Sequence, residues 1–228
     1  MLLPSSSALS ARLRRSARVG ALVVASLGSF VAATAIDAGS VSAEAAELPV
    51  NQLAPEITAA ANQAVAALDA YQLSGSVEDE RTLAWHRAIT ARYTAQQLGY
   101  DEFAMVDAWS TAPVGHQRAV LGALTQVGVP YRTNTSIENE GFDCSGLTTY
   151  AWAGAGVELY RQSGSQISES TKLAKEDAKA GDLVHYSGHI MMYLGVDDAI
   201  VHSVQTGRTV EIDTITSRRS VTFGDPTA

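Results

Sequence analysis

Residues 141–152 read GFDCSGLTTYAW and include Cys144, the only cysteine among the 228 residues of the chain. A single cysteine cannot form a disulfide within its own chain, so its side chain serves packing, regulation or chemistry. The residues from Leu147 to Trp152 predict a helix whose first turn holds the sulfur. Backbone N–H groups at a helix N-terminus stabilise a thiolate, the nucleophilic form of cysteine. Because cysteine is also a common core residue, a packing role for Cys144 stays open at this point.

Two later segments carry histidines in strand-like patterns. HIMMYLG begins at His189, and AIVHSV contains His202. Alternation along a strand places His189 on the same face as Met191, and His202 on the same face as Ile200. If the two segments pair as a hairpin, His202 lies beside His189. A thiol nucleophile needs a base and a third group that orients the base, and Cys144, His189 and His202 occur in that order.

The stretch from Val127 to Ile212 resembles the NlpC-type peptidoglycan endopeptidases, which are papain-like cysteine peptidases of bacterial cell walls. Any one matching motif is a weak signal, but their order and spacing together are a strong one. In chain order the motifs are GVPY from Gly128, GFDCSGL from Gly141, AGVEL and RQSGSQ between Ala155 and Gln166, AGDLV from Ala180, HIMMYLG from His189 and IVHS from Ile200.

The resemblance implies a catalytic triad and a reaction. Cys144 is implied as the nucleophile, His189 as the base and His202 as the polar residue that orients it. The implied substrates are peptidoglycan stem peptides, cleaved between the γ-carboxyl of D-glutamate and a diamino acid through an acyl group on sulfur. No metal ion and no organic cofactor is implied.

The resemblance also implies a substrate site beside the nucleophile. Asp143 is expected to bind the free amine of a stem peptide, with Ser145 and Tyr131 lining the same site. After Pro-Tyr the family continues through an aromatic residue to a pair of glycines, whereas residues 132–135 here read RTNT. The wall of the groove is therefore expected to differ, with Arg132 either pairing with a substrate carboxylate or remaining a solvated loop cation.

Three alternatives compete with this interpretation. His185 lies four residues before His189 and is a second candidate base, although alternation places it on the face of Leu183. A protein that kept the fold but lost turnover would bind muropeptides without cleaving them. An amidase or acyltransferase on the same scaffold would use the same triad on another substrate, without needing the amine site at Asp143.

The N-terminal region has the order of a signal peptide. Arginines at positions 12, 14, 15 and 18 precede a largely apolar run from Val19 to Ile36, and small residues follow as far as Ala43. We expect cleavage after Ala43 or Ala46, although the apolar run is also long enough for a membrane anchor. Residues 1–43 therefore predict a secreted, cell-wall or extracellular protein, without stable membrane insertion once the signal is removed.

The chain is acidic, with 24 Asp and Glu against 16 Lys and Arg and a formal net charge of −8. Removal of residues 1–43 takes away four arginines and one aspartate, which leaves a formal charge of −11. Such a chain is not expected to bind nucleic acid. The sequence leaves the oligomeric state open.

Residues 44–112 predict a helical segment ahead of a catalytic domain at 113–228. Helices are expected from Pro55 to Leu73, from Ser76 to Gly99 and, in a shorter form, from Asp101 to Trp109. This segment is interpreted as a packing appendage or a lid over the cysteine site, because nothing in it resembles a repeat or an aromatic sugar platform. Docking to the wall and inhibition of the enzyme stay open as alternatives.

The C-terminal half predicts an α+β domain, because helices come first and strands follow. By resemblance to papain-like folds, the nucleophile helix is expected to pack on the antiparallel sheet. The expected elements are a helix at Gly115–Gln126 and strands at Asp182–Tyr186, His189–Leu194, Ala199–Val204 and Arg208–Ile212.

Overall fold

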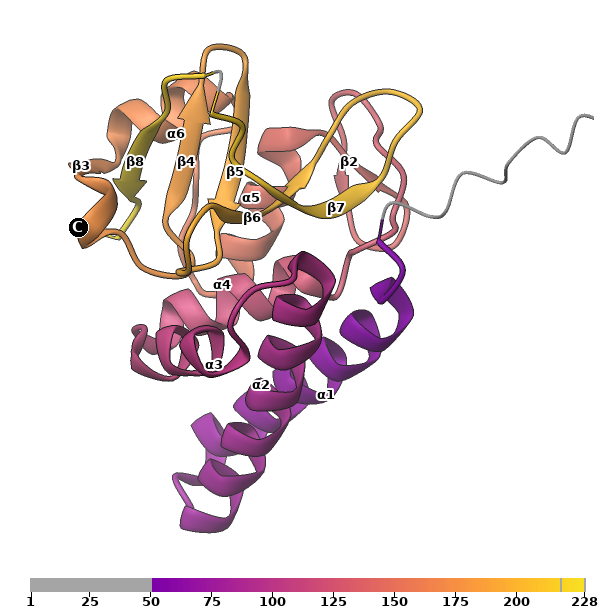
Figure 1. The fold of residues 1–228 in the computed structure, drawn as a ribbon, viewed down its shortest axis with the longest axis vertical. Helices are drawn as coiled ribbons and strands as arrows, with labels where there is room; N and C mark the ends of the chain where they lie inside the picture. The colour runs from indigo at the N-terminus through magenta and orange to yellow at the C-terminus, as the bar shows by residue number, and fades with distance from the viewer. Residues whose placement is uncertain (1–50, 218, 228) are drawn as a thin grey trace, which may run out of the picture. The chain divides into compact units, whose positions relative to one another are not determined.

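A helical hairpin opens the described part of the chain, which comprises residues 51–217 and 219–227 of the computed structural model. In Figure 1 its two helices, α1 (Ala54–Ser74) and α2 (Val77–Leu98), lie side by side. They end at Gly75 and Gly99, whose φ angles of 61° and 70° are left-handed and stop a helix at little steric cost. The predicted helices are therefore confirmed to within one residue at each end.

Polar side chains cap the N-termini of helix α2 and of the helix that follows it. Ser76 accepts a hydrogen bond of 3.1 Å from the backbone N–H of Asp79 and so caps α2. Asp101 accepts one of 2.7 Å from Ala104 and caps α3 (Glu102–Thr111). Each cap satisfies an N–H group that has no partner within its helix. The next helix, α4 (Val114–Leu124), begins directly after Pro113.

Six strands form one antiparallel sheet in the order β3-β8-β4-β5-β6-β7. The four predicted strands are β4 to β7, whereas the sequence analysis missed the short outer strands β3 and β8 and the short helix α6. The bounds are β3 (Thr171–Leu173), β4 (Leu183–Tyr186), β5 (His189–Tyr193), β6 (Ala199–Ser203), β7 (Val210–Thr214), β8 (Thr222–Asp225), α6 (Ser163–Glu169) and a 3₁₀ turn, η1 (Lys175–Asp177).

The helix that begins with Cys144, α5 (Cys144–Gly154), packs on one face of this sheet, as predicted. A two-stranded ribbon, β1 (Ser136–Ile137) and β2 (Gly141–Phe142), precedes it. Leu147 and Trp152 of α5 share a buried cluster with Ile190 and other inward-facing residues of the sheet. The opposite face carries a separate cluster that includes Met191. The observed architecture is the α+β arrangement expected from the sequence.

The helical segment and the sheet share one hydrophobic core. Ile57 of α1 and Trp109 of α3 are buried in the same cluster as the sheet residues. Trp109 donates a hydrogen bond of 2.8 Å from Nε1 to the carbonyl oxygen of Leu194. Asn51 pairs with the backbone of Ile212 through bonds of 2.9 and 2.7 Å. Residues on both sides of position 112 therefore contribute to one buried interior.

A buried polar cluster ties α4 to the sheet. His116 Nε2 lies 3.1 Å from Asp182 Oδ1 and 3.6 Å from Asp225 Oδ1, and Lys179 Nζ lies 2.7 Å from Asp225 Oδ2. Burial opposes ionisation of Asp225, but hydrogen bonds from Lys179 and Thr227 hold its pKa at about 2. The donor atoms of His116, Asp182 and Asp225 are of the kind that bind metal ions. Because Lys179 already supplies a cation, the cluster works as an internal ion-pair network.

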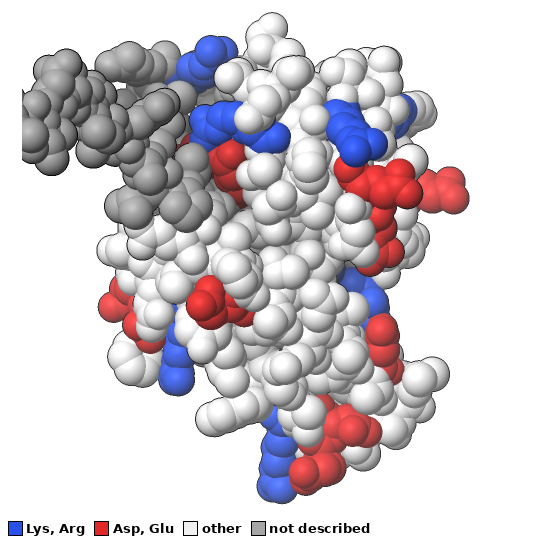
Figure 2. All heavy atoms as spheres, turned by 90° about the vertical axis from the view of Figure 1, so that its right-hand side faces the viewer, with Lys and Arg blue, Asp and Glu red and all other residues white. Residues whose placement is uncertain are grey.

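The predicted signal segment, residues 1–43, lies outside the described residues. Within the ranges that the structure describes, none of the helices combines the length and the apolar character needed to cross a bilayer. On the face shown in Figure 2, acidic and basic side chains are interspersed with uncharged ones.

Candidate active site

The nucleophile candidate stands at the first position of α5. Asp143 is the N-cap, and its Oδ1 accepts a hydrogen bond of 2.7 Å from the backbone N–H of Gly146. Cys144 follows it and is half-buried. A Cβ atom at Gly146 would clash with the carbonyl oxygen of Thr135, so the motif requires glycine there. The Asp-Cys-Ser-Gly motif thus sets the start of the helix and places Cys144 among free N–H groups.

The two candidate histidines form a buried, hydrogen-bonded pair. β5 and β6 are antiparallel neighbours, as the predicted hairpin requires. His189 Nε2 lies 2.9 Å from His202 Nδ1, with the ring centroids 5.2 Å apart at 73°. Only 7% of His189 and 8% of His202 is exposed to solvent. Strand pairing therefore joins the two imidazoles that the sequence placed on separate segments.

Burial keeps His189 neutral. Loss of solvation lowers its pKa to about 3, and the nearby charges of His202, Arg219 and His185 act in the same direction. A neutral imidazole is able to accept a proton, which an imidazolium cannot do. His189 is thus held in the protonation state that a general base needs.

Asp213 on β7 extends the histidine pair and was not anticipated from the sequence. His202 Nε2 is buried and has no hydrogen-bond partner among the described residues. The nearest carboxylate oxygen, Asp213 Oδ2, lies 3.7 Å away. The interaction with His202 is the main cause that lowers the pKa of Asp213. The only available signal in the sequence was an acidic residue just after the last predicted strand.

A buried hydrogen bond connects the residue before the N-cap of α5 with the strand of His202. Ser203 Oγ donates a hydrogen bond of 2.7 Å to the carbonyl oxygen of Phe142. Tyr131 is bridged to Phe142, and its pKa is raised by burial and then by the charges of Cys144 and Asp143. In the described residues the thiol of Cys144 does not form a hydrogen bond with His189. Contacts of this kind are often long in enzymes without substrate and tighten when it binds.

Arg161 is the second functional candidate that the sequence analysis missed as a site residue. It lies in the RQSGSQ motif and forms a two-pronged ion pair with Asp143, with Nη1–Oδ1 at 2.9 Å and Nη2–Oδ2 at 2.6 Å. Its Nη1 also donates to Ser145 Oγ at 2.9 Å. Asp143 and Ser145 are therefore brought together as expected, but around an arginine of the same chain.

Gln166, at the end of the same motif, fastens this loop to α5. Its Nε2 donates to the carbonyl oxygens of Ser145 and Tyr160, at 3.0 and 2.7 Å. Its Oε1 accepts a bond of 2.6 Å from Thr148. Because Gln166 is buried and bonded to the helix, it holds the loop of Arg161 against the first turn of α5.

The other two candidates occupy more peripheral places. Arg132 is exposed, and its aliphatic part passes over Gly141, where a Cβ atom would clash with it. This contact accounts for the glycine before Phe142. His185 lies on β4 opposite Ile190 in the sheet, and burial lowers its pKa.

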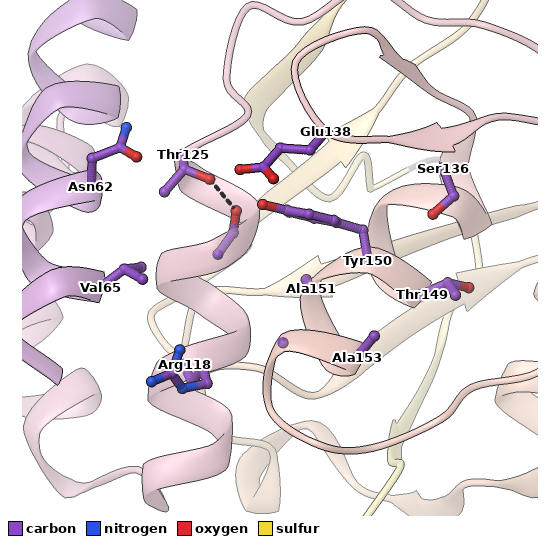
Figure 3. A pocket seen from close by; sticks show the side chains of 12 residues that line it. Asn62, Val65, Arg118, Thr125, Ser136, Glu138, Thr149, Tyr150, Ala151 and Ala153 are labelled. Atoms are coloured by element: carbon purple, nitrogen blue, oxygen red, sulfur yellow. Dashed lines mark hydrogen bonds between the residues drawn. The ribbon is translucent and has the colours of Figure 1, made fainter. Parts of the chain in front are cut away.

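A pocket of about 420 Å³ lies between α1, α4, α5 and the β1 segment. In Figure 3, Tyr150 extends from α5 toward Thr125 and Glu138, opposite Asn62 and Val65 of α1. None of the three triad candidates lines it. A smaller pocket, of about 160 Å³, lies beside the histidines and is lined by His202, Asp213, Tyr186 and Arg219 among others.

Comparison with known proteins identifies the C-terminal part of the chain. Residues 128–222 match the model of the NlpC/P60 family. Over 108 residues the chain is 32% identical to the peptidoglycan endopeptidase RipA of Mycolicibacterium smegmatis. This match covers 40% of this chain and 22% of that protein. Over 100 residues it is 34% identical to the peptidoglycan endopeptidase RipB of Mycobacterium tuberculosis. This second match covers 37% of this chain and 42% of that protein.

The structure of Rv1477, a hypothetical invasion protein of Mycobacterium tuberculosis, matches with a TM-score of 0.45 and 23% identity, over 62% of this chain and 82% of that chain. The chain spans less than half the length of the two curated relatives named above. Residues 128–222 therefore belong to the NlpC/P60 family, and this part of the chain is homologous to peptidoglycan endopeptidases of that family.

Proposed function

We propose that this protein is a secreted cysteine endopeptidase that hydrolyses peptidoglycan stem peptides with Cys144, His189 and His202. The observation that carries the proposal is the buried hydrogen bond of 2.9 Å between the two imidazoles, in the same domain as a cysteine at a helix N-terminus. Homology to peptidoglycan endopeptidases supports the substrate class.

One arrangement of protons makes the histidine pair a competent base. If His189 accepts the thiol proton on Nδ1, its Nε2 carries hydrogen and donates to His202 Nδ1. His202 then carries its own hydrogen on Nε2, which faces Asp213 Oδ2 at 3.7 Å. A carboxylate in that position favours this tautomer and stabilises positive charge on the pair. Asp213 is therefore a positioning residue that acts through His202.

The chemical step is acyl transfer to sulfur. The thiol proton passes to His189 as sulfur attacks the amide carbonyl, and the C–N bond breaks as His189 returns the proton to the leaving amine. His189 then takes a proton from water, whose oxygen attacks the thioester; the C–S bond breaks to release the acid, and His189 returns the proton to the sulfur of Cys144. The backbone N–H of Cys144 is proposed to stabilise the oxyanion, with the hydroxyl of Tyr131 as a second donor.

The bond proposed for cleavage joins the γ-carboxyl of D-glutamate to the diamino acid of the stem peptide. To test this, purified muropeptides are incubated with the protein lacking residues 1–43 and with its Cys144→Ala variant, and the products are analysed by mass spectrometry. We expect two fragments whose masses correspond to hydrolysis at that bond, formed by the unsubstituted protein alone. Intact muropeptides in both samples would instead favour a binding protein without turnover, and cleavage between sugar and peptide would indicate an amidase.

A further inference from the structure

We propose that the pocket between α1, α4 and α5 is a second binding site, for a short peptide with an ammonium group at one end and a carboxylate at the other. Its volume of about 420 Å³ lies within the range of small-ligand sites, about 300–1,000 Å³. Because α1 and α4 lie outside residues 128–222, one wall of the pocket is formed by parts of the chain that the family match does not include. The inference is independent of the proposed function, since none of the triad candidates lines this pocket.

One end of the pocket presents hydrogen-bond acceptors. Asn62 donates from Nδ2 to the carbonyl oxygen of Thr58 at 2.8 Å, which leaves its Oδ1 as an acceptor. Glu138 lines the same end in Figure 3 and forms no ion pair with the residues that the structure describes. Both side chains are exposed, so a ligand reaches them from solvent. An ammonium group has three donors and no acceptor, and it therefore matches an amide oxygen beside a carboxylate that has no counter-ion.

The hydroxyl of Tyr150 holds Glu138 at this end. Burial is the main cause that raises the pKa of Tyr150, and its hydrogen bond with Glu138 raises the pKa further. The hydroxyl therefore stays protonated and donates to the carboxylate, while Gln126 Nε2 donates to the hydroxyl oxygen at 3.4 Å. In Figure 3, Tyr150 extends from α5 toward Glu138 and Thr125. A cation bound to Glu138 thus lies close to an aromatic ring, whose face attracts cations.

The other end of the pocket presents the guanidinium of Arg118. Its Nη2 donates to Asp69 and, at 2.8 Å, to Gln72, which are both on α1. Among the described residues, Nη1 and Nε form no hydrogen bond, so their N–H groups remain for a ligand. The side chain is 15% exposed. A carboxylate is the group that pairs with two nitrogens of one guanidinium.

The separation of the two ends fits a tripeptide. Thr125 shares the hydroxyl of Tyr150 with Glu138, and it follows Arg118 by seven residues along α4 and its C-cap. The rise of 1.5 Å for each residue of a helix places these positions about 10 Å apart. Three extended residues span at most about 10 Å. The wall between the ends is apolar and includes Val65 and Ala151, so small apolar side chains suit the middle of the ligand.

The test measures binding of trialanine, which has a free ammonium and a free carboxylate, by NMR titration of the protein. We expect a dissociation constant of about 1 mM or tighter, with the largest shifts at Val65, Ala151 and Tyr150. Two matched peptides test the two ends without altering the protein. N-acetyl-trialanine lacks the ammonium and trialanine amide lacks the carboxylate, and each should bind about tenfold more weakly, the effect of one charge-assisted hydrogen bond.

Variants assign each end of the ligand to a side chain. Glu138→Gln should weaken binding of trialanine about tenfold and leave binding of the acetylated peptide unchanged. Glu140→Gln is the control, because Glu140 is exposed on the same loop and does not line the pocket. Arg118→Gln should weaken trialanine and leave the amide unchanged. If Arg118→Gln does not fold, the comparison of trialanine with its amide still tests this end.

Three results would overturn the inference. The first is the absence of shifts around this pocket at about 10 mM trialanine, including the case in which shifts occur only around His189 and His202. The second is equal affinity for the free and the blocked peptides. The third is an effect of Glu138→Gln no larger than that of Glu140→Gln. None of these results bears on cleavage by the triad, so the proposed function is tested separately.

Discussion

The hydroxyl of Ser203 donates a hydrogen bond of 2.7 Å to the carbonyl oxygen of Phe142. Ser203 follows His202 on β6, and Phe142 precedes the N-cap of α5. The bond therefore joins the strand of His202 to the segment at which the helix of Cys144 starts. It is fully buried at the serine, where solvent cannot replace it.

Replacement of this serine should loosen the site. In Ser203→Ala the carbonyl oxygen of Phe142 keeps only the backbone N–H of Arg132, at 3.0 Å. We expect a loss of about 1–2 kcal/mol in the free energy of unfolding, measured with urea, and a lower kcat. Ser168, exposed at the end of α6, bonds only to the nearby Ser165 carbonyl, and Ser168→Ala should change neither value. Equal effects of the two substitutions would contradict the role given to Ser203.

Asp213 should act on the rate through His202. Asp213→Ala removes the carboxylate that favours hydrogen on His202 Nε2, so we expect kcat to fall about tenfold while KM changes little. Because the charge also stabilises a protonated histidine pair, the pH profile of kcat should shift. Asp213→Asn retains an acceptor oxygen and should recover part of the rate. An exposed carboxylate in η1 provides the control, Asp177→Ala, and a pH profile identical in all variants would rule out the positioning role.

The neutral state of His189 predicts a dependence of stability on pH. Its pKa is about 3 in the folded protein and about 6.5 in the unfolded chain, so between these values the unfolded chain binds more protons. Folding is therefore favoured above pH 6.5 and loses stability as the pH falls toward 3.

Between pH 6.5 and pH 3, the free energy of unfolding is expected to fall by about 1.4 kcal/mol for each pH unit. Urea unfolding at pH 6.5 and 4.5 should show a drop in stability that is larger in the unsubstituted protein than in His189→Gln by about 2 kcal/mol. NMR titration should show His189 still neutral at pH 5. Protonation of His189 near pH 6.5 would contradict its low pKa.

Two tryptophans of the helical segment allow a buried position to be compared with an exposed one. Trp109 is 1% exposed and bonds to Leu194, whereas Trp85 on α2 is 64% exposed. Trp109→Ala should lower the free energy of unfolding by about 3–5 kcal/mol, and Trp85→Ala by less than about 0.5 kcal/mol. A similar small loss in both would show that the helices before Pro113 do not support the catalytic part.

This shared core changes how the helical segment is best tested. A protein that begins near Pro113 would expose the side of the core that Ile57, Met105 and Trp109 cover. Any loss of activity in it would therefore mix instability with function. Single substitutions on the exposed faces of α1 and α2, in the full chain, are the cleaner test of inhibition or docking.

Local signals predicted much of the fold. Gly75 and Gly99 ended two helices within a residue of the prediction, because a left-handed glycine acts within a single turn. Short apolar, strand-like runs predicted β4 to β7, and two of these strands, β5 and β6, are buried along their whole length. β3 and β8 were missed because they are short, and β8 contains Gly224, whose lack of a side chain admits Ile167 and Ser170.

The site residues that lie in family motifs could be predicted from the sequence. The contacts between residues far apart in the sequence could not. Cys144, His189 and His202 lie in motifs, so their residue types were informative. The pairing of Arg161 with Asp143 spans 18 residues and an irregular loop, and no periodicity reports such a contact. Asp213 reaches His202 only because β7 pairs with β6.

The central claim is that His189 is the base for Cys144, and kinetics of two matched histidine variants test it most directly. With the same muropeptide substrate, His189→Gln should lower kcat/KM by about 10²–10⁴-fold, the usual contribution of a general base. His185→Gln, on the neighbouring strand, should change it by less than about threefold. Equal losses in the two variants, or a larger loss in His185→Gln, would contradict the account.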